Sequence, residues 1–316
     1  MSKFDRLSVY AVLLASGLAL FACRGRQTKD KYTDTATSGF ISISADESFR
    51  RIVQQEIDVF ESIYTMAGID PIYASEVDAI NLLLKDSVRL TVSTRRLTDA
   101  EKAGLEEKKF FPKEFKVASD AIALIVNRQN PDSIISLKDL SRILTGEVTE
   151  WSELYPGSKL GKLQLVFDNP NSSTVRYAID SICRGRPLAG SLHAQKSNAE
   201  VIDFVAQSPS AIGVIGVSWV GSESDSTNLS FSDRVTVMAV SREEKATEQN
   251  SYKPFQAYMA LGDYPLMRDV RDPDRPSQGT GFGLFHFSRF RPGTADHPAG
   301  RSDARYAERA DRQRER

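Results

Sequence analysis

Four small polar residues stand side by side in the stretch FDNPNSSTVRYAIDSICRG, which covers residues 167 to 185. They are Asn171, Ser172, Ser173 and Thr174, and an apolar run with helical spacing follows them. Such side chains are unfavourable inside a helix but cap the unpaired N–H groups at its start. One capping residue is enough, so four in a row favour a second task. Clustered hydroxyl and N–H donors at this point are typical of a site for a phosphate-sized anion, and the alternative is an ordinary capped helix after a turn.

Two other strand-to-helix junctions carry polar residues of the same kind. They are Ser44-Ala45-Asp46-Glu47-Ser48-Phe49 at the first junction, and Ser93, Thr94, Arg95 and Arg96 at the second. Arginine can bond a phosphate through two N–H groups at once. Three such junctions in one chain favour an anion site more than any one of them does. The arginine pair alone is equally compatible with a solvated surface.

The elements that must position these junctions alternate between strand and helix. Strands are expected at residues 39–45, 70–75, 88–94, 114–127, 163–169 and 211–220, and as further candidates at 235–241 and 254–262. Helices are expected at residues 46–68, 76–87, 97–108, 136–146, 173–183 and 198–207. This alternation predicts an α/β fold with mainly parallel sheets flanked by helices. In that class, ligands bind beyond the carboxyl ends of strands, close to the starts of helices.

The long strand at residues 114–127 has the length to cross between two lobes. We therefore expect lobe 1 at residues 39–118, lobe 2 at residues 119–245, and a return segment to lobe 1 at residues 246–270.

The overall charge and the catalytic motifs point away from several classes of protein. With 41 basic and 42 acidic residues the net charge is −1, which gives no reason to expect a nucleic acid partner. His193 is the one histidine outside the C-terminal tail, and the sequence around Ser218 misses the spacing of a nucleophile elbow by one residue. No paired carboxylates and no metal-ligand spacing stand out. We expect no enzymatic activity, no catalytic residue, no metal and no cofactor.

The first 23 residues have the pattern of a lipoprotein signal peptide. A basic start precedes an apolar run from Val9 to Phe21, which is too short for a comfortable membrane span. The run ends in LFAC, which resembles the lipobox of bacterial lipoproteins, although Phe21 is bulkier than usual. We expect Cys23 to carry the lipid that anchors the protein at the periplasmic face of a bacterial membrane, the alternative being a chance cysteine. Residues 24–38 are polar and typical of a flexible tether.

Five segments, taken in order, resemble the phosphate-binding periplasmic binding proteins of ABC transporters. They are FISISADESF, LTVSTRRLTDAE, LKDLSRILTGEVTEWSEL, FDNPNSST and NAEVIDFVAQSPSAIGVIG, and together they extend from about residue 39 to residue 264. The resemblance implies a two-lobed type II binding fold, or Venus flytrap, which closes on inorganic phosphate. It further implies a monomer that delivers the phosphate to the permease subunits of an ABC transporter.

The resemblance also implies which residues bind. By position these are the Ser48 hydroxyl, the Phe49 backbone N–H, Ser75, Ser93 and Thr94 from lobe 1, and Ser172, Ser173 and Thr174 from lobe 2. The family often has an acidic residue where Thr94 stands, an arginine near Phe167 and a glycine where Ser173 stands. Arg95, Arg96 or Arg176 is expected to supply the missing positive charge. These departures keep a second possibility open, namely a sensory protein or a receptor for another oxyanion.

The composition changes after Val270. Residues 271–316 are rich in Arg, Asp and Pro and contain neither Lys nor Ile. One interpretation is a disordered basic tail. The other is a single-base deletion near the codon of Val270, because codons allowed by this tail, read one base later, permit a strand, a capped helix and a final strand. That alternative segment resembles the family's C-terminal return to lobe 1, and the DNA sequence at this position tests the hypothesis.

Overall fold

The computed structural model describes residues 35–190, 192–222 and 230–274, all within one compact unit of the chain. The expected signal peptide, the lipidation residue Cys23 and the tail from residue 275 lie outside the described residues. Within the described part, no helix has the length and hydropathy needed to cross a membrane. The same ranges contain no group of three or more His, Cys, Asp or Glu side chains arranged to hold a metal ion.

One mixed sheet runs through the described residues. Its strand order is β2-β1-β3-β12-β4-β8-β6-β7, with β9 paired to β4, and a second sheet has the order β11-β10-β5. The strands of the large sheet are β1 (Ser38–Asp46), β2 (Met66–Ala74), β3 (Leu90–Val92), β4 (Lys113–Val126), β6 (Gln164–Phe167), β7 (His193–Ala194), β8 (Ala211–Gly216), β9 (Thr236–Val237) and β12 (Met267–Asp274). Those of the small sheet are β5 (Ile134–Ser136), β10 (Ala239–Ser241) and β11 (Ser251–Tyr252).

Helices pack around the sheets. They are α2 (Arg50–Ile63), α3 (Glu76–Leu84), α4 (Asp99–Glu107), α5 (Leu137–Leu144), α6 (Ser173–Tyr177), α7 (Asn198–Gln207) and α8 (Gln256–Leu261). Helix α4 packs on α3. Short helical turns are η1 (Glu47–Phe49), η2 (Trp151–Glu153), η3 (Ala178–Ile182) and η4 (Val217–Trp219). The buried residues of α2 are Val53, Ile57 and Phe60, whose spacing places them on one face against the sheet.

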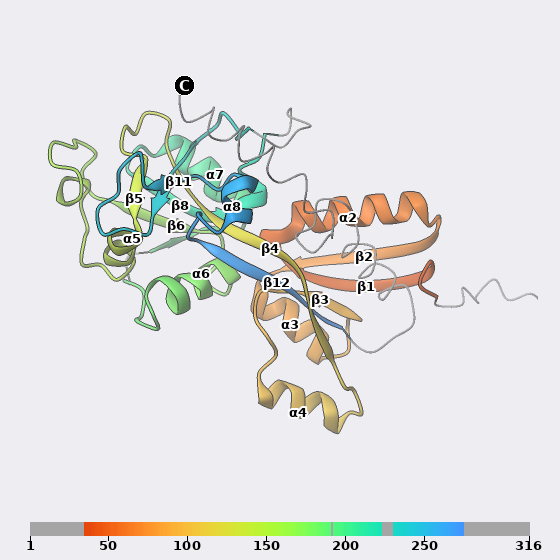
Figure 1. Ribbon diagram of the computed structural model, residues 1–316. Helices are drawn as coiled ribbons and strands as arrows, with labels where there is room; N and C mark the ends of the chain where they lie inside the picture. The colour runs from red at the N-terminus through yellow and green to blue at the C-terminus, as the bar shows by residue number, and fades with distance from the viewer. Residues whose placement is uncertain (1–34, 191, 223–229, 275–316) are drawn as a thin grey trace, which may run out of the picture. The chain divides into compact units, whose positions relative to one another are not determined.

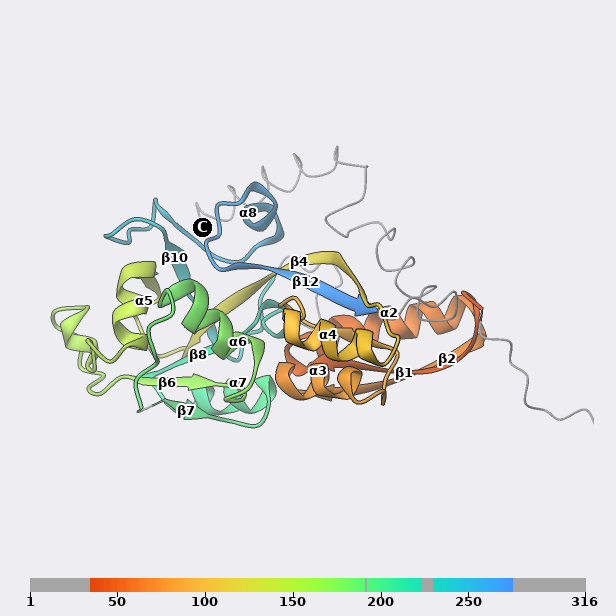
Figure 2. The same ribbon diagram turned by 90° about the horizontal axis from the view of Figure 1, so that it is seen from below.

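Two long antiparallel strands, β4 and β12, link the two halves of the sheet (Figures 1 and 2). On one side of them β1 pairs in parallel with β2 and β3, and on the other β6 pairs in parallel with β7 and β8. Each half has its own buried apolar clusters. Lobe 1 has one beneath α2 and a small one formed by Ile80, Leu97 and Leu105, and lobe 2 has two around β6, β8 and α7. The predicted two-lobed α/β fold is therefore confirmed. We call the β1–β3 half lobe 1 and the β6–β8 half lobe 2.

The structure corrects three of the expected elements. Residues 254–262, proposed as a strand, contain helix α8, because Phe255, Tyr258 and Met259 recur at helical spacing and Gly262 ends the helix with a φ of +76°. The first long helix ends at Ile63 rather than at residue 68, which already lies in β2. Residues 271–274, assigned to the irregular tail, continue strand β12 alongside β4.

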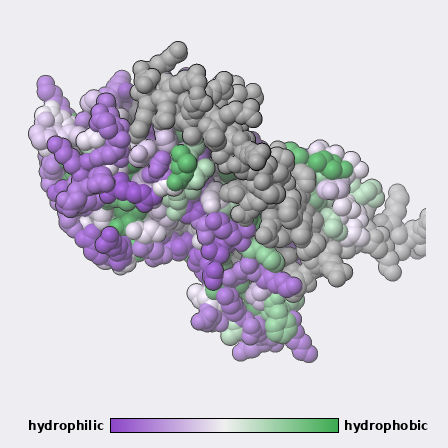
Figure 3. All heavy atoms as spheres, in the orientation of Figure 1, coloured by the Kyte–Doolittle hydropathy of each residue, from purple (hydrophilic) through white to green (hydrophobic). Residues whose placement is uncertain are grey.

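Hydrophilic side chains dominate the described surface in Figure 3, with hydrophobic patches over α2 and near α4. Exposed apolar side chains in these regions include Ile52, Ile63 and Phe111. Scattered exposure of this kind is ordinary for a folded protein. The polar groups that remain deeply buried are more informative, and they collect where β1 and β6 end.

Candidate functional site

The polar turn predicted from the sequence lies at the carboxyl end of the buried strand β6. Ser172, Ser173 and Thr174 form this turn, which we call the donor turn, and all three are buried. The Ser172 hydroxyl donates to Asp168 Oδ1 at 2.7 Å, and the Thr174 hydroxyl donates to the same oxygen at 2.5 Å. Asp168 is itself 1% exposed. The donor turn is thus organised around one buried carboxylate from its own lobe.

The first junction of lobe 1 faces the donor turn directly. Strand β1 ends at Asp46, and the Ser48 backbone N–H donates to Asp46 Oδ1 at 2.7 Å. The Ser173 backbone N–H, from lobe 2, donates to Asp46 Oδ2 at 2.9 Å. The Ser48 hydroxyl in turn donates to Asp168 Oδ2 at 3.5 Å. The structure therefore brings the end of β1 and the donor turn together, although Asp46 and Ser173 are 127 positions apart in the chain.

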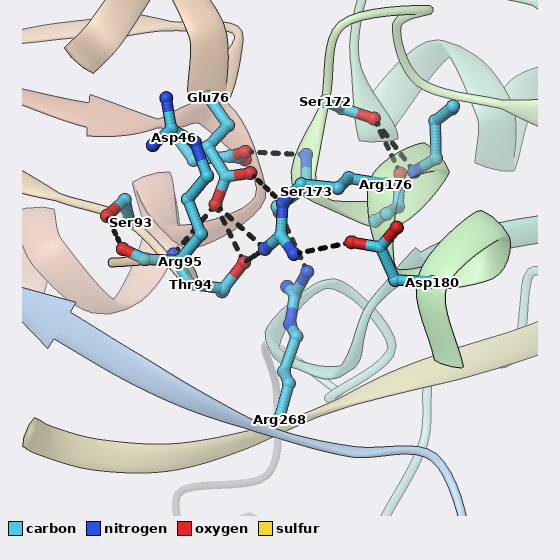
Figure 4. Close-up of polar contacts among 12 residues, drawn as sticks. Asp46, Glu76, Ser93, Thr94, Arg95, Ser172, Ser173, Arg176, Asp180 and Arg268 are labelled. Atoms are coloured by element: carbon cyan, nitrogen blue, oxygen red, sulfur yellow. Dashed lines mark hydrogen bonds and ion pairs between the residues drawn. The ribbon is translucent and has the colours of Figure 1, made fainter. Parts of the chain in front are cut away.

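A buried arginine lies at the centre of this meeting point. Arg268, on β12, is 6% exposed and donates through Nε to Asp120 Oδ2 at 2.8 Å. Its Nη1 donates to the Ser173 hydroxyl at 2.8 Å (Figure 4). Its guanidinium carbon lies 4.7 Å from the centre of the Phe49 ring. Its Nη2 is buried and has no hydrogen-bond partner among the described residues. A buried cationic donor without a partner is costly, and an anion is the group that would satisfy it.

Gly216 keeps the space beside Arg268 open. A methyl group added at Gly216 would lie 3.0 Å from the Ser48 carbonyl oxygen and 3.5 Å from Arg268 Nη2. The φ of Gly216 is −66°, so an alanine there is not strained by its backbone. Glycine is therefore needed at this position because a side chain would fill the space, and not because of the backbone conformation.

We predict that Gly216→Ala weakens anion binding about tenfold, because its methyl group enters the space beside Arg268. The effect is measured by calorimetric titration. Gly104→Ala is the matched control, since nothing lies within 4 Å of the added methyl group and affinity should not change. Equal affinity in the Gly216→Ala and Gly104→Ala variants would contradict the prediction.

A second polar cluster joins the lobes next to the first one. Arg176, from α6 in lobe 2, donates through Nε to Glu76 Oε2 at 2.6 Å and through Nη2 to the Thr94 hydroxyl at 2.5 Å. The Glu76 side chain is 2% exposed, and its Oε1 also accepts from the Thr94 N–H and hydroxyl. Burial raises the pKa of Glu76. The hydrogen bond and charge of Arg176 and the hydrogen bonds of Thr94 outweigh this effect and bring the pKa below its usual value. We call Glu76, Thr94 and Arg176 the interlobe ion pair.

The other predicted site residues are engaged locally. The Ser75 hydroxyl caps α3 by accepting from the Asp78 N–H at 3.2 Å, and the Ser93 hydroxyl donates to the Arg95 carbonyl at 3.2 Å. The Arg95 guanidinium is held by both carboxylate oxygens of Glu101, at 2.7 and 2.8 Å. Arg95 therefore does not supply the expected positive charge at the donor turn, because its charge is already neutralised within lobe 1.

Glu47 adds a carboxyl group of unusual protonation to the interlobe region. Its Oε2 accepts from the backbone N–H and the side-chain amide of Asn198, at 3.2 and 2.5 Å. Its Oε1 is buried and has no partner among the described residues. Burial, followed by the charges of Asp168 and Asp46, raises the pKa of Glu47 to about 7 against the hydrogen bonds of Asn198. Glu47 is therefore half protonated near neutral pH.

This raised pKa makes a prediction for stability. Below its unfolded pKa, 4.5, Glu47 is neutral in both states, and between 4.5 and about 7 the folded protein binds more protons than the unfolded one. As the pH rises from 4.5 to about 7, the free energy of unfolding should therefore fall by about 2 kcal/mol, a figure that is reduced for the partial exposure of Glu47. Glu47→Gln should remove this loss, as measured by urea denaturation at pH 5 and pH 8. Glu106→Gln, on the exposed side of α4, is the control, and an unaltered pH dependence in Glu47→Gln would contradict the assignment.

Asp168 has a raised pKa as well, because it is buried and because the charge of Asp46 lies close to it. A carboxyl group in this position can accept a proton from a protonated ligand more readily than an ordinary aspartate can. The site therefore combines a cation, hydroxyl and N–H donors, and a carboxylate that acts as an acceptor. This combination suits an oxyanion that still carries a hydrogen.

Several residues of the site were missed by sequence reasoning. The sequence analysis gave no role to Asp46, Glu47 and Asp168, although they stand in the junction segments, and it did not single out Glu76, Asp120, Asn198 and Arg268. Arg268 had a detectable signal, since Tyr264, Leu266, Arg268 and Val270 alternate at inward-facing positions and an arginine breaks the apolar pattern. Asp168, which directly follows the strand before the donor turn, had a positional signal. No signal in the sequence indicates the pairing of Asp46 with Ser173, because only the tertiary fold brings them together.

Comparisons with known proteins agree with the two-lobed architecture. The profile of the PBP superfamily domain matches residues 30–271. The phosphate-binding protein PstS of Bacillus subtilis is 25% identical over 272 residues, which cover 82% of this chain and 80% of that protein.

Two solved structures share the fold. A putative phosphate ABC transporter substrate-binding protein from Clostridium perfringens, solved with bound phosphate, has a TM-score of 0.63 at 20% identity, with 79% of this chain and 92% of that chain covered. An ABC-type phosphate transport receptor from Vibrio cholerae has a TM-score of 0.56 at 19% identity, with 79% and 93% covered. The match of the superfamily profile to residues 30–271, most of the sequence, shows the family. The chain belongs to the PBP superfamily and, within it, is similar to the phosphate-binding proteins PstS.

Proposed function

We propose that this protein captures inorganic phosphate between its two lobes and delivers it to the permease of an ABC transporter. The observation that carries the proposal is the buried, unpartnered Nη2 of Arg268 beside the donor turn. It is supported by the names of the relatives described above, which are phosphate-binding proteins and transport receptors. The protein would perform no covalent chemistry.

The donor and acceptor groups favour phosphate over sulfate. Arg268, the Ser48 and Ser173 N–H groups and the hydroxyls of the donor turn can donate to an oxyanion. Asp168, 1% exposed and with a raised pKa, supplies an acceptor for a hydrogen on the ligand. Phosphate carries at least one hydrogen at neutral pH and sulfate carries none. Sulfate would therefore place its oxygens against a carboxylate with no hydrogen bond to offset the repulsion.

Binding would couple to closure of the lobes around the hinge strands β4 and β12. Contacts between lobe 1 and lobe 2 include the interlobe ion pair and the bond between Asn198 and Glu47. Closing such a cleft excludes water and strengthens each hydrogen bond to the anion, because the local dielectric falls. Ligand exchange would then require these interlobe contacts to break.

The expected anchor fits this function. A lipid on Cys23, followed by the polar tether of residues 24–38, would keep a monomeric receptor near its permease at the periplasmic face of the membrane. This part of the proposal rests on the lipobox-like sequence. Mass spectrometry of the protein purified from membranes tests it, since a diacylglyceryl-modified peptide beginning at Cys23 is the expected product and an intact, unmodified leader would contradict it.

The experiment that tests the ligand is a calorimetric titration of the full chain with phosphate, followed by sulfate under the same conditions. Saturable binding of one phosphate per chain, with sulfate at least 100-fold weaker, is the expected result. A folded protein that gives no heat with phosphate would overturn the proposal. Binding of sulfate with equal strength would move the function to the broader class of oxyanion receptors.

A further inference from the structure

Asp46 occupies an unusual position for a capping residue. It is fully buried at the end of β1, and its Oδ1 accepts from the Ser48 N–H of the same turn at 2.7 Å. That bond alone is an ordinary cap of η1. Its second oxygen, Oδ2, accepts from the Ser173 N–H of the other lobe at 2.9 Å. One carboxylate thus bridges the facing N–H groups of two lobes, as a bound oxyanion would.

The neighbouring donors are occupied by another carboxylate of the chain. The hydroxyls of Ser172 and Thr174 donate to one oxygen of Asp168, and the hydroxyl of Ser48 donates to the other oxygen. Among the described side-chain donors of this site, Arg268 Nη2 is buried and left without a partner. Side-chain carboxylates therefore satisfy the same groups that the proposed function assigns to the ligand.

We propose that Asp46 acts as a built-in anion, which holds the lobes together in the ligand-free protein and is displaced from the Ser173 N–H when phosphate binds. The inference rests on the proposed function, since it concerns the same donors. Phosphate and Asp46 compete for one N–H group, and two negative charges at that point repel each other. The contact of Asp46 with the Ser173 N–H stabilises the ligand-free closed state. Phosphate must displace this contact, so the same free energy lowers the affinity for phosphate.

The sharpest variant is Asp46→Asn. Its amide oxygen can still accept from the Ser48 N–H and keep the cap. Its amide nitrogen cannot accept from the Ser173 N–H, so the contact between the lobes is lost along with the negative charge. Asp70→Asn is the matched control, because it removes one negative charge from an exposed position on β2 in the same lobe.

The protein carries its own reporter of lobe closure. Trp219, at η4 in lobe 2, donates from its indole N–H to the Ser48 carbonyl at 3.1 Å and is 6% exposed. Opening of the lobes would break this bond and expose the indole to water, which shifts its fluorescence to longer wavelength. Trp151, the other of the two tryptophans in the chain, is fully buried and bonds the Ser210 carbonyl within lobe 2, so it gives a constant background.

The test measures phosphate affinity by calorimetry and tryptophan emission without ligand in the full chain and its two variants. We expect Asp46→Asn to bind phosphate about tenfold more tightly than wild type and to show red-shifted emission that phosphate reverses. Asp70→Asn should match wild type in both measurements. Unchanged or weaker phosphate binding by Asp46→Asn would overturn the inference, while phosphate binding by the wild type would leave the proposed function standing.

The two proposals can also be distinguished if the protein does not bind phosphate. If neither wild type nor Asp46→Asn binds phosphate, the proposed function is lost, and the emission of the ligand-free proteins decides the inference. A red shift in Asp46→Asn alone would then support Asp46 as the group that holds the lobes together. Identical emission in all three proteins would overturn that role.

Discussion

Removing the charge of Arg268 is expected to abolish phosphate binding. In the Arg268→Gln variant the site loses its buried cation, and the affinity for phosphate should fall at least about 100-fold, which corresponds to roughly 2.7 kcal/mol. The variant also leaves Asp120, 4% exposed, as a buried carboxylate without its partner. Breaking such a pair from one side destabilises a protein by about 3 to 5 kcal/mol, so this single variant can fail to fold.

The Arg268→Gln/Asp120→Asn variant separates binding from folding. It removes both charges of the pair, and replacing a buried ion pair by neutral groups changes stability far less than removing one partner. We expect its urea denaturation midpoint to lie near that of wild type while calorimetry detects no phosphate binding. Arg234→Gln is the control, because Arg234 pairs with Asp203 at a surface where both side chains are more than half exposed. Phosphate binding of wild-type strength in the double variant would exclude Arg268 as a ligand.

Breaking the interlobe ion pair is expected to have the next largest effect. Arg176→Met leaves the Glu76 carboxylate, 2% exposed, without its cationic partner whenever the lobes are closed. Because the Arg176 side chain is 31% exposed, we expect the closed state to lose about 2 kcal/mol of stability, which is less than for a fully buried pair. Phosphate binds the closed protein, and this loss shifts the ligand-free protein from the closed toward the open state. Phosphate affinity measured by calorimetry at pH 7 should therefore fall, by at most about 30-fold.

The pH dependence of this effect follows from the lowered pKa of Glu76. In wild type its stabilising contribution is present above the usual pKa of 4.5 and is lost as the pH falls through the lower, folded value. In Arg176→Met burial raises that pKa, so protonation relieves the unpaired charge and the difference from wild type should narrow toward pH 4. Arg176→Met/Glu76→Gln should recover most of the affinity at pH 7. Arg186→Met breaks an exposed pair with Glu147 inside lobe 2, and an equal loss in that control would refute a specific role for the interlobe contact.

The sequence predicted the architecture, and it located the junctions that the structure brings together, because both depend on local patterns. Alternating and helical spacings gave the strands and helices around the junctions, and the donor turn was visible as a run of capping residues. The structure places Ser48, Phe49 and residues 172–174 at one point, as expected. Helix α8 was missed because a short apolar run fits a strand and a helix equally well until its period is weighed.

The remaining part of the site depends on contacts that local patterns do not encode. Arg268 reaches Asp120 because β12 pairs with β4 in a register that places these two residues opposite each other. The position of Arg95 made it a candidate for the cation of the site, but its guanidinium forms an ion pair with Glu101, six residues later. Asp46 and Ser173 are 127 positions apart and meet only when two lobes are folded and closed.

The central claim is that phosphate binds at Arg268 between the donor turn and the end of β1. The most direct measurement is a crystal structure of the full chain with arsenate, whose arsenic gives an anomalous signal at the place of phosphorus. We predict a single peak whose oxygens lie within hydrogen-bonding distance of Arg268 Nη2 and of the donor turn, with Asp46 withdrawn from the Ser173 N–H. An arsenic peak elsewhere on the protein, or none at millimolar arsenate, would contradict the account.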